Sequence, residues 1–189
     1  YCADIPQSAF DLARACWPGP LTMILKRRPI VPDVVTAGMD TVGMRCPSHP
    51  VCRAILQAAE VPVAAPSGNT SGRPSPTTAA HMAEDMEGRI DAIVDGGPCS
   101  VGVESTIVDL TETPPRLLRP GGITLEQLES VLGRVEVDHA VTRLMSAGEK
   151  PRAPGMKYRH YAPKAPVTVV AGPPERTAEH IARSLTPGD

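Results

Sequence analysis

The chain has 189 residues, 41% of them hydrophobic and 21% charged, with a formal net charge of −2 and a pI near 6.2. This length and apolar content suit one globular domain, with or without a further fragment. The near-neutral charge balance argues against a protein that binds nucleic acid through a strongly basic surface. No apolar run approaches the roughly 18 residues that a membrane-spanning helix needs, so we expect a soluble protein without a membrane partner.

The cysteines and histidines do not form the usual metal or disulfide motifs. The five cysteines contain no Cys-x-x-Cys pair, and no secretory signal accompanies them. The five histidines show no His-x-x-x-His spacing. We therefore expect reduced thiols in a cytoplasmic protein, and the sequence assigns no metal ligands.

Apolar periodicity and turn residues predict alternating helices and strands. In chain order these are a helix over 8–16, strands over 21–26 and 41–46, a helix over 50–59, a strand over 63–65, a helix over 78–87, strands over 92–95, 105–110 and 116–119, and a helix over 124–132. Ser8 is the expected N-cap of the first helix, and Thr124 with Gln127 forms a capping-box pattern in the last. This alternation predicts an α/β layered fold with a mixed sheet.

Both ends of the chain lead us to expect a piece of a longer protein. The sequence opens on Tyr1 instead of methionine, and the first predicted helix follows almost at once. Residues 138–165 lack an apolar period and contain several prolines, which predicts a linker. A strand over 165–172 and a helix over 176–185 follow, too little for a domain. We expect a first domain over 1–137, a linker over 138–165 and the start of a truncated second domain over 166–189.

The segment Val61-Pro-Val-Ala-Ala-Pro-Ser-Gly-Asn-Thr-Ser-Gly72 carries the clearest functional signal. Its small hydroxyl residues and glycines leave backbone N–H groups open to an anion, and the helix that begins near residue 78 adds a positive N-terminus. This pattern favours a phosphate site, with a nucleotide as the natural ligand. The alternative is a polar turn that only caps the next helix, because Ser, Gly and Asn are common turn residues.

A second unusual stretch is Pro154-Gly-Met-Lys-Tyr-Arg-His-Tyr-Ala-Pro163. Aromatic and cationic side chains together suit stacking on a base or closing over a phosphate. The alternative is a linker whose Tyr158 and Tyr161 pack on the surface of the domain.

Six motifs follow one another along the chain: Trp17-Pro-Gly-Pro-Leu-Thr22, Thr41-Val-Gly-Met-Arg-Cys-Pro47, Ala65-Pro-Ser-Gly-Asn69, Gly102-Val-Glu-Ser-Thr-Ile-Val-Asp109, Leu118-Arg-Pro-Gly121 and the 154–163 stretch. In this order they resemble the YrdC/Sua5 family. The last motif is similar to the Sua5 branch, in which an ordered linker joins a YrdC-like domain to a smaller Rossmann-like domain. The resemblance implies a YrdC-like twisted mixed sheet flanked by helices, then a linker and the start of the Sua5 domain.

The resemblance also implies an activity, that of an L-threonylcarbamoyladenylate synthase, which is a nucleotidyltransferase. L-threonine, bicarbonate or CO2, and ATP would give threonylcarbamoyl-AMP and pyrophosphate, for the N6-threonylcarbamoyl modification of adenosine 37 in tRNA. ATP would be a substrate, with Mg2+ bridging its phosphates, and tRNA would be reached only through a downstream transferase complex. Such chemistry needs residues that position two anions, and it needs no covalent nucleophile.

By resemblance, individual residues are assigned to the two substrates. Those implied to bind ATP are Thr41, Ser67, Asn69, Ser75, Arg119 and Tyr158, and those implied to bind L-threonine are Arg45, Ala65 and Ser105. Arg45 suits a carboxylate because its planar guanidinium can donate two hydrogen bonds. Thr41 lies four residues earlier on the same predicted strand and therefore on the same face.

Structural alternatives stand beside these assignments. They are plain β-propensity for Thr41, a surface ion pair for Arg45, a turn or helix cap for Ser75, and a strand-end cation for Arg119. No magnesium ligand is assigned, because structural roles suit Glu104 and Asp109 better.

One element of the family pattern is missing. The family carries an N-terminal Lys-x-Arg element that holds the nucleotide phosphates, whereas Lys26-Arg27-Arg28 follows the Trp-Pro-Gly-Pro motif instead of preceding it. We therefore expect this chain alone to bind ATP weakly or not at all and to be inactive by itself. Two other functions stay open: a double-stranded RNA-binding module, and a carbamoyl-adenylating domain of the hydrogenase-maturation type, against which the 154–163 stretch weighs.

Overall fold

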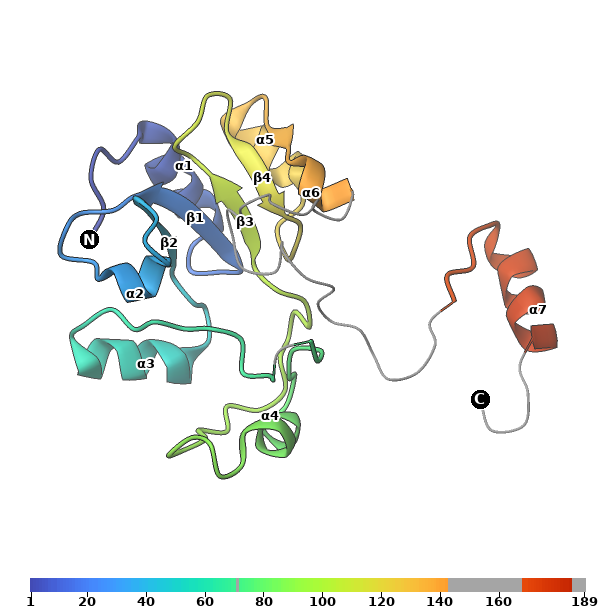
Figure 1. The fold of residues 1–189 in the computed structure, drawn as a ribbon. Coiled ribbons are helices and arrows are strands. Elements are labelled where there is room, and N and C mark those ends of the chain that lie inside the picture. The colour runs from blue at the N-terminus through green and yellow to red at the C-terminus, as the bar shows by residue number, and fades with distance from the viewer. Residues whose placement is uncertain (71, 143–167, 185–189) are drawn as a thin grey trace.

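The computed structural model describes residues 1–70, 72–142 and 168–184, and it centres on a five-stranded sheet (Figure 1). The strands are β1 (Leu21–Lys26), β2 (Thr41–Arg45), β3 (Thr106–Asp109), β4 (Arg116–Arg119) and β5 (Glu136–Val137), in the spatial order β2-β1-β3-β4-β5. The pairs β1–β2 and β3–β4 are antiparallel, and the pairs β1–β3 and β4–β5 are parallel. The predicted α/β class with a mixed sheet is confirmed.

The described residues also form seven helices. These are α1 (Gln7–Cys16), α2 (Asp33–Thr36), α3 (Pro50–Ala59), α4 (Ala79–Met86), α5 (Leu125–Leu132), α6 (His139–Thr142) and α7 (Pro174–Ser184). α1 and α5 pack against each other and against the sheet, whereas α3 and α4 lie apart from the strands (Figure 1). Within the described part of the chain, no helix is both long and apolar enough to cross a membrane.

The core lies between one face of the sheet and the helices α1 and α5. Alternate residues of β1, namely Leu21, Met23 and Leu25, point to this face because strand side chains alternate in direction. They pack with Leu12 of α1 and Leu128 of α5, both of which are fully buried. Burial of each such side chain stabilises the fold by about 1.5–3 kcal/mol. The residues between them on β1 therefore turn to the opposite face.

Two of the predicted strands are wrong. Residues 63–65 and 92–95 form no strand, and Val63 and Val94 are 54% and 65% exposed. A strand is stable only when its backbone N–H and C=O groups pair with a neighbour, and no described segment pairs with either stretch. The predicted strand over 165–172 lies partly outside the described residues, and residues 168–172 form none. The helix expected after it is present as α7.

The helix ends bear out one predicted cap and correct another. Thr124 N donates to Gln127 Oε1 at 2.9 Å and Gln127 N donates to Thr124 Oγ1 at 3.3 Å, so the predicted capping box of α5 is confirmed. Ser8 is not the N-cap of α1, because the helix begins at Gln7 and its N-cap is Pro6, two residues before Ser8. Proline has a φ angle already suited to a helix entry. The elements α2, β5 and α6 were not predicted, since they are too short to give a periodic signal.

Candidate functional site

The face of the sheet opposite α1 and α5 carries several of the residues that the sequence singled out. On β2, Thr41, Gly43 and Arg45 share this face, because every second residue of a strand points the same way. Thr41 pairs with Lys26 of β1, and Arg45 pairs with Thr22. The predicted common face of Thr41 and Arg45 is therefore confirmed.

The register of the sheet aligns four residues in one row across four strands. Arg45 of β2 pairs with Thr22 of β1, Thr22 pairs with Ile107 of β3, and Ile107 pairs with Arg119 of β4. Paired residues on neighbouring strands point to the same face, which holds for Arg45, Thr22 and Ile107. The β3–β4 register shifts between Ile107 and Val108, and Arg119 reaches this face through its hydrogen bonds to Ser105. At about 4.8 Å per strand, roughly 14 Å separates the backbones of Arg45 and Arg119. The row therefore has an arginine at each end, with Thr22 and the buried Ile107 between them.

Ser105, which directly precedes β3, is held in this row from two sides. Its Oγ lies 2.8 Å from Thr22 Oγ1. Arg119 donates from Nε and Nη2 to the Ser105 carbonyl at 3.1 and 2.9 Å, and from Nη2 to Ser105 Oγ at 3.2 Å. The residue is 9% exposed. The Arg119 guanidinium is thus directed along the row toward Thr22, which is not the arrangement of a solvated cation at a strand end.

Arg45 and the nearby Gly43 of β2 are both exposed. Arg45 is exposed, and within the described ranges it forms no ion pair with an Asp or Glu. Gly43 is also exposed, and a Cβ at this position would lie 3.2 Å from Thr22 Cγ2 and 3.3 Å from Ile24 Cδ1. A small ligand can therefore approach the backbone beside a guanidinium that has no carboxylate partner in the described structure.

The Ser-Gly-Asn loop packs against α4. Gly68 lies so close to this helix that a Cβ would collide with Met82 Sδ. Asn69 Nδ2 donates to the carbonyl oxygens of Thr70 at 3.0 Å and Arg73 at 2.9 Å. The loop is therefore closed by its own amide side chain, and its position follows that of α4.

Asp85 of α4 anchors the loop. Its side chain is only 6% exposed, and it accepts hydrogen bonds from Thr70 N at 3.3 Å and from the guanidinium of Arg73. Arg73 also donates to Glu84 Oε1 at 2.9 Å. This hydrogen bond to Glu84, together with the negative charges of Asp85 and Glu84, raises the pKa of Arg73. The charge of Arg73 is thus committed to α4.

The other predicted residues of the loop are either exposed or contain a buried polar atom without a hydrogen-bond partner in the described structure. Ser67 and Ala65 are exposed, whereas Asn69 Oδ1 and Ser75 Oγ are buried and have no hydrogen-bond partner among the described residues. Buried polar atoms without a partner are uncommon in folded proteins, and a bound water, ion or ligand is one usual explanation.

The predicted site residues therefore fall into two groups. The sheet group comprises Thr41, Arg45, Ser105 and Arg119, and the loop group comprises Ala65, Ser67, Asn69 and Ser75. In the parts of the chain that are described, no hydrogen bond or ion pair joins the loop group to Arg45, Ser105 or Arg119. Tyr158, the remaining predicted residue, lies outside the described residues.

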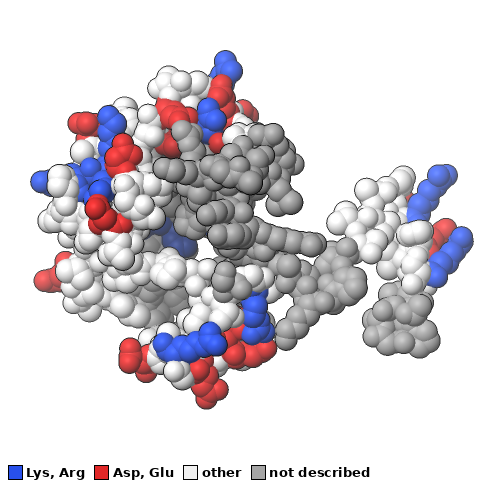
Figure 2. All heavy atoms as spheres, viewed as in Figure 1, with Lys and Arg blue, Asp and Glu red and all other residues white. Residues whose placement is uncertain are grey.

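Figure 2 shows the surface of the molecule from the same side as Figure 1. A recess lies between the part that holds the sheet and the part that holds α3, and Lys or Arg atoms are visible inside it. Among the described residues on the face that Figure 2 shows, positive side chains stand next to negative ones.

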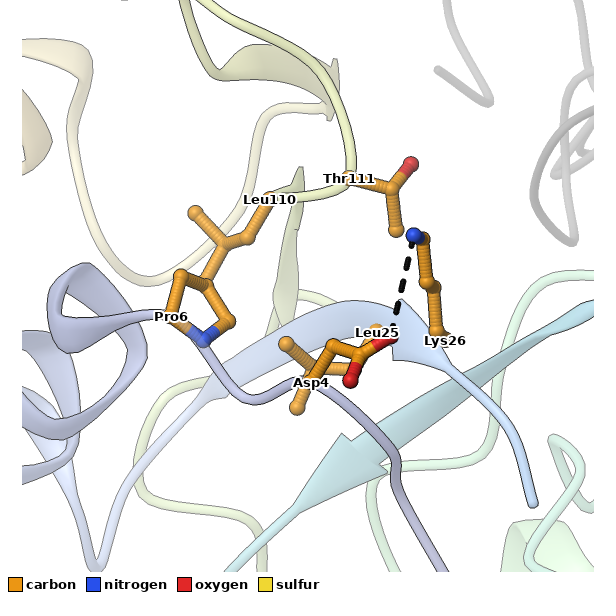
Figure 3. A pocket seen from close by; sticks show the side chains of 6 residues that line it. All are labelled: Asp4, Pro6, Leu25, Lys26, Leu110 and Thr111. Carbon is orange, nitrogen blue, oxygen red and sulfur yellow. Dashed lines mark ion pairs between the residues drawn. The ribbon is translucent and has the colours of Figure 1, made fainter.

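A separate cavity lies at the other end of the strands (Figure 3). It has a volume of about 150 Å³ and is lined by Asp4, Pro6, Leu25, Lys26, Leu110 and Thr111. Lys26 Nζ lies 3.9 Å from Asp4 Oδ2, so its charge already has a partner there. A second, wider cavity lies beside Arg27 and Asp40. Neither contains a residue of the sheet group or the loop group.

Asp109, one of the two carboxylates considered as metal ligands, stabilises the turn after β3. Asp109 Oδ1 accepts hydrogen bonds from Thr111 N at 2.9 Å and Thr111 Oγ1 at 2.6 Å. Across the described ranges, no three side chains of His, Cys, Asp or Glu come together as a metal site. The five cysteines are free thiols, and burial raises the pKa of Cys2 and Cys16.

Thr22 is the residue of this face that sequence reasoning passed over. It belongs to a quoted motif, Trp17-Pro-Gly-Pro-Leu-Thr22, and it lies at an alternate position of a correctly predicted strand. That alternation already placed Thr22 away from the core. Its neighbours on β2 and β3 depend on register, which the sequence did not supply.

Comparison with known proteins decides the family. The Sua5/YciO/YrdC family model, described as telomere recombination, matches residues 1–121. The chain belongs to this family. A second model, described as the C-terminal domain of threonylcarbamoyl-AMP synthase, matches residues 123–188.

Relatives and a solved structure support the same family. The chain is 50% identical over 178 residues to the threonylcarbamoyl-AMP synthase of Pyrococcus abyssi, covering 94% of this chain and 52% of the relative. It is 49% identical over 187 residues to that of Bacillus subtilis, covering 97% and 52%. The crystal structure of P. abyssi Sua5 complexed with L-threonine matches with a TM-score of 0.90 and 49% identity, covering 96% of this chain and 53% of that one. The chain therefore spans about half the length of the curated relatives it matches, and its predicted fold class is confirmed.

Proposed function

We propose that the protein to which this chain belongs is an L-threonylcarbamoyladenylate synthase. One observation carries the proposal: the register and the hydrogen bonds of Ser105 bring Arg45, the Thr22–Ser105 hydroxyl pair and Arg119 together on the face of the sheet opposite α1 and α5. Two separated cations suit two anionic substrates held side by side. About half of the aligned residues are shared with enzymes named threonylcarbamoyl-AMP synthase, which supports the same reaction.

The Arg45 end of the row is proposed to bind L-threonine. Arg45 has no carboxylate partner among the described residues, and a guanidinium binds a carboxylate through two parallel hydrogen bonds. Ser105, whose Oγ lies 2.8 Å from Thr22 Oγ1, and the exposed residue Ala65 are assigned to the same substrate. The relative solved with L-threonine is consistent with this choice of amino acid.

The remaining members are proposed to bind ATP. Arg119 and Thr41 act from the sheet, and Ser67, Asn69 and Ser75 act from the loop, where small side chains let phosphate oxygens approach backbone N–H groups. The buried Asn69 Oδ1 and Ser75 Oγ, which lack partners among the described residues, are compatible with a polar ligand at the loop. Tyr158 is assigned to cover the nucleotide, outside the described residues.

In the proposed reaction, the protein positions the two substrates, neutralises the charge on the phosphates and forms no covalent bond to either substrate. The amine of L-threonine adds to CO2, giving a carbamate and releasing a proton. A carbamate oxygen then attacks the α-phosphorus of ATP, and the bond to the β,γ-pyrophosphate breaks. Arg45 holds the amino acid so that the carbamate faces the phosphate, and Arg119 stabilises charge on the nucleotide. Threonylcarbamoyl-AMP and pyrophosphate are the products.

A magnesium ion is proposed to accompany ATP, as in most phosphoryl chemistry. The described residues fit this ion only in part, because they offer Asn69 Oδ1 as a neutral oxygen and no group of carboxylates. Mg2+ commonly keeps several waters and takes other ligands from substrate phosphates. No step above depends on a protein ligand to the metal.

The proposal extends to the organisation and setting of the protein. The YrdC-like domain spans residues 1–137, the linker 138–165 and the start of the Sua5 domain 166–189. The product would serve N6-threonylcarbamoyl modification of adenosine 37 in tRNA through a downstream transferase, in the cytoplasm. This chain by itself is proposed to be inactive, because the phosphate-binding Lys-x-Arg element of the family has no counterpart in it.

The test is pyrophosphate release from ATP by the full-length natural protein, measured with and without L-threonine in bicarbonate buffer. We expect release that requires L-threonine, and none from the 189-residue chain alone. Release that requires carbamoyl phosphate instead of threonine would favour the hydrogenase-maturation type of domain. Salt-sensitive RNA binding without pyrophosphate release would favour the RNA-binding module.

A further inference from the structure

A contact between two hydroxyl groups joins Thr22 of β1 to Ser105, the residue directly before β3. Thr22 Oγ1 and Ser105 Oγ are 2.8 Å apart, and either can be the donor. Arg119 Nη2 donates to Ser105 Oγ at 3.2 Å, so one acceptor position of that oxygen is filled. Thr22 also lies directly across from Arg45 in the β1–β2 register. It is therefore the residue that links the two cations of the row.

Counting hydrogens shows what this pair can offer a ligand. Two hydroxyl groups carry two hydrogens, and one of them is used between Thr22 and Ser105. Arg119 contributes a donor and accepts nothing, so it takes up no hydroxyl hydrogen. Whichever hydroxyl donates within the pair, the hydrogen of the other remains available. The pair thus presents one donor, and its location next to Arg45 suits an acceptor on the ligand that Arg45 binds.

The position of Thr22 also gives it access to a ligand. Thr22 is only partly buried, and the residue that faces its methyl group from β2 is Gly43, which has no side chain. A larger residue at position 43 would cover this methyl group. Thr22 is thus accessible on the same face as the exposed Arg45, as far as the described residues are concerned.

We propose that Thr22 is a positioning residue for the amino-acid substrate: it fixes the orientation of the Ser105 hydroxyl so that the pair donates one hydrogen bond to the ligand held by Arg45. This inference rests on the proposed function and adds to it a residue that none of the assigned binding roles includes. The hydroxyl of Thr22 matters here, because its methyl group and strand position would be kept by valine.

The experiment uses the full-length protein and compares Thr22→Val with Thr22→Ser by calorimetric titration of L-threonine and of ATP. Valine keeps the shape and removes the hydroxyl, and serine keeps the hydroxyl. We expect Thr22→Val to raise the Kd for L-threonine about tenfold, with the Kd for ATP changed less than about twofold. Thr22→Ser should stay within about twofold of the wild type for both ligands. Thr36→Val, a buried hydroxyl loss in α2, is the matched control and should change neither.

The outcomes separate this inference from the function it rests on. A wild-type protein that binds no L-threonine refutes the proposed function. A wild type that binds, with Thr22→Val binding equally well, refutes the role of Thr22 alone. Equal losses for L-threonine and ATP also refute it, since they indicate a general structural effect. Should Thr22→Val fail to fold, the methyl NMR signal of Thr22 in the unmodified protein decides: it should shift on addition of L-threonine, and an unchanged signal refutes the role.

Discussion

Replacing Gly43 with alanine tests whether substrates approach the sheet between Thr41 and Arg45. Gly43 lies midway between these two residues on the same face of β2, and Thr41 is assigned to ATP and Arg45 to L-threonine. The new Cβ would lie 3.2 Å from Thr22 Cγ2 and 3.3 Å from Ile24 Cδ1. Both neighbours are ends of side chains and can move by a few tenths of an ångström.

The effects on folding and on binding should differ in size. Alanine in a strand is favoured over glycine by about 0.5–1 kcal/mol, which offsets the tight contacts, so we expect the free energy of unfolding to change by less than about 1 kcal/mol. On the binding side, a methyl group in this space displaces the ligand from at least one charge-assisted hydrogen bond. Such a bond contributes about 1.5–3 kcal/mol. The Kd for L-threonine should therefore rise roughly ten- to hundredfold.

The assay is calorimetric titration of L-threonine into the full-length protein, with thermal unfolding measured on the same samples. Gly172→Ala is the matched control, because its Cβ would lie at an ordinary 3.4 Å from Thr177 Oγ1 and outside the site. Unchanged affinity for L-threonine in Gly43→Ala, in a protein that binds it when unmodified, would refute the placement of the substrate over β2.

Three further predictions concern other parts of the chain. Arg45→Ala should raise the L-threonine concentration required for pyrophosphate release much more than the required ATP concentration. Equal effects in initial-rate assays would contradict the assignment of Arg45 to L-threonine and Arg119 to ATP. Thr124→Ala should lower the free energy of unfolding by about 1 kcal/mol in urea titrations, because α5 loses its cap. Hydrogen bonds from its own backbone N–H and then from Thr124 lower the pKa of Glu126. The ionised carboxylate of Glu126 therefore stabilises the fold above the ordinary carboxyl pKa of 4.5, and this stabilisation is lost as the pH falls through the lowered pKa. Thr124→Ala should therefore weaken this acid dependence. Burial raises the pKa of Cys16, so mass spectrometry should find it alkylated by iodoacetamide more slowly than the exposed Cys99.

Local sequence patterns were enough to predict the structure of segments whose conformation depends on their own residues. The capping box of α5 needs only Thr124 and Gln127 three positions apart, and both hydrogen bonds form. The alternation of β1 directs Leu21, Met23 and Leu25 to one face and Thr22 to the other without reference to any other strand, although Ile24 on that other face is buried too. By contrast, 63–65 and 92–95 have strand-like composition and form no strand, because pairing requires a neighbour that composition cannot specify.

The sequence by itself determined the α/β class, the common face of Thr41 and Arg45, and the motifs that marked most of the candidate residues. Side-chain direction along one strand or helix follows from local backbone geometry, so the order of residues is sufficient for it. Only the tertiary structure decided that Arg45, Thr22 and Arg119 lie in one row, and that the Ser-Gly-Asn loop is anchored to α4. Register between strands and the docking of a loop depend on contacts between segments far apart in the chain, and a slip of one residue would turn every side chain to the other face.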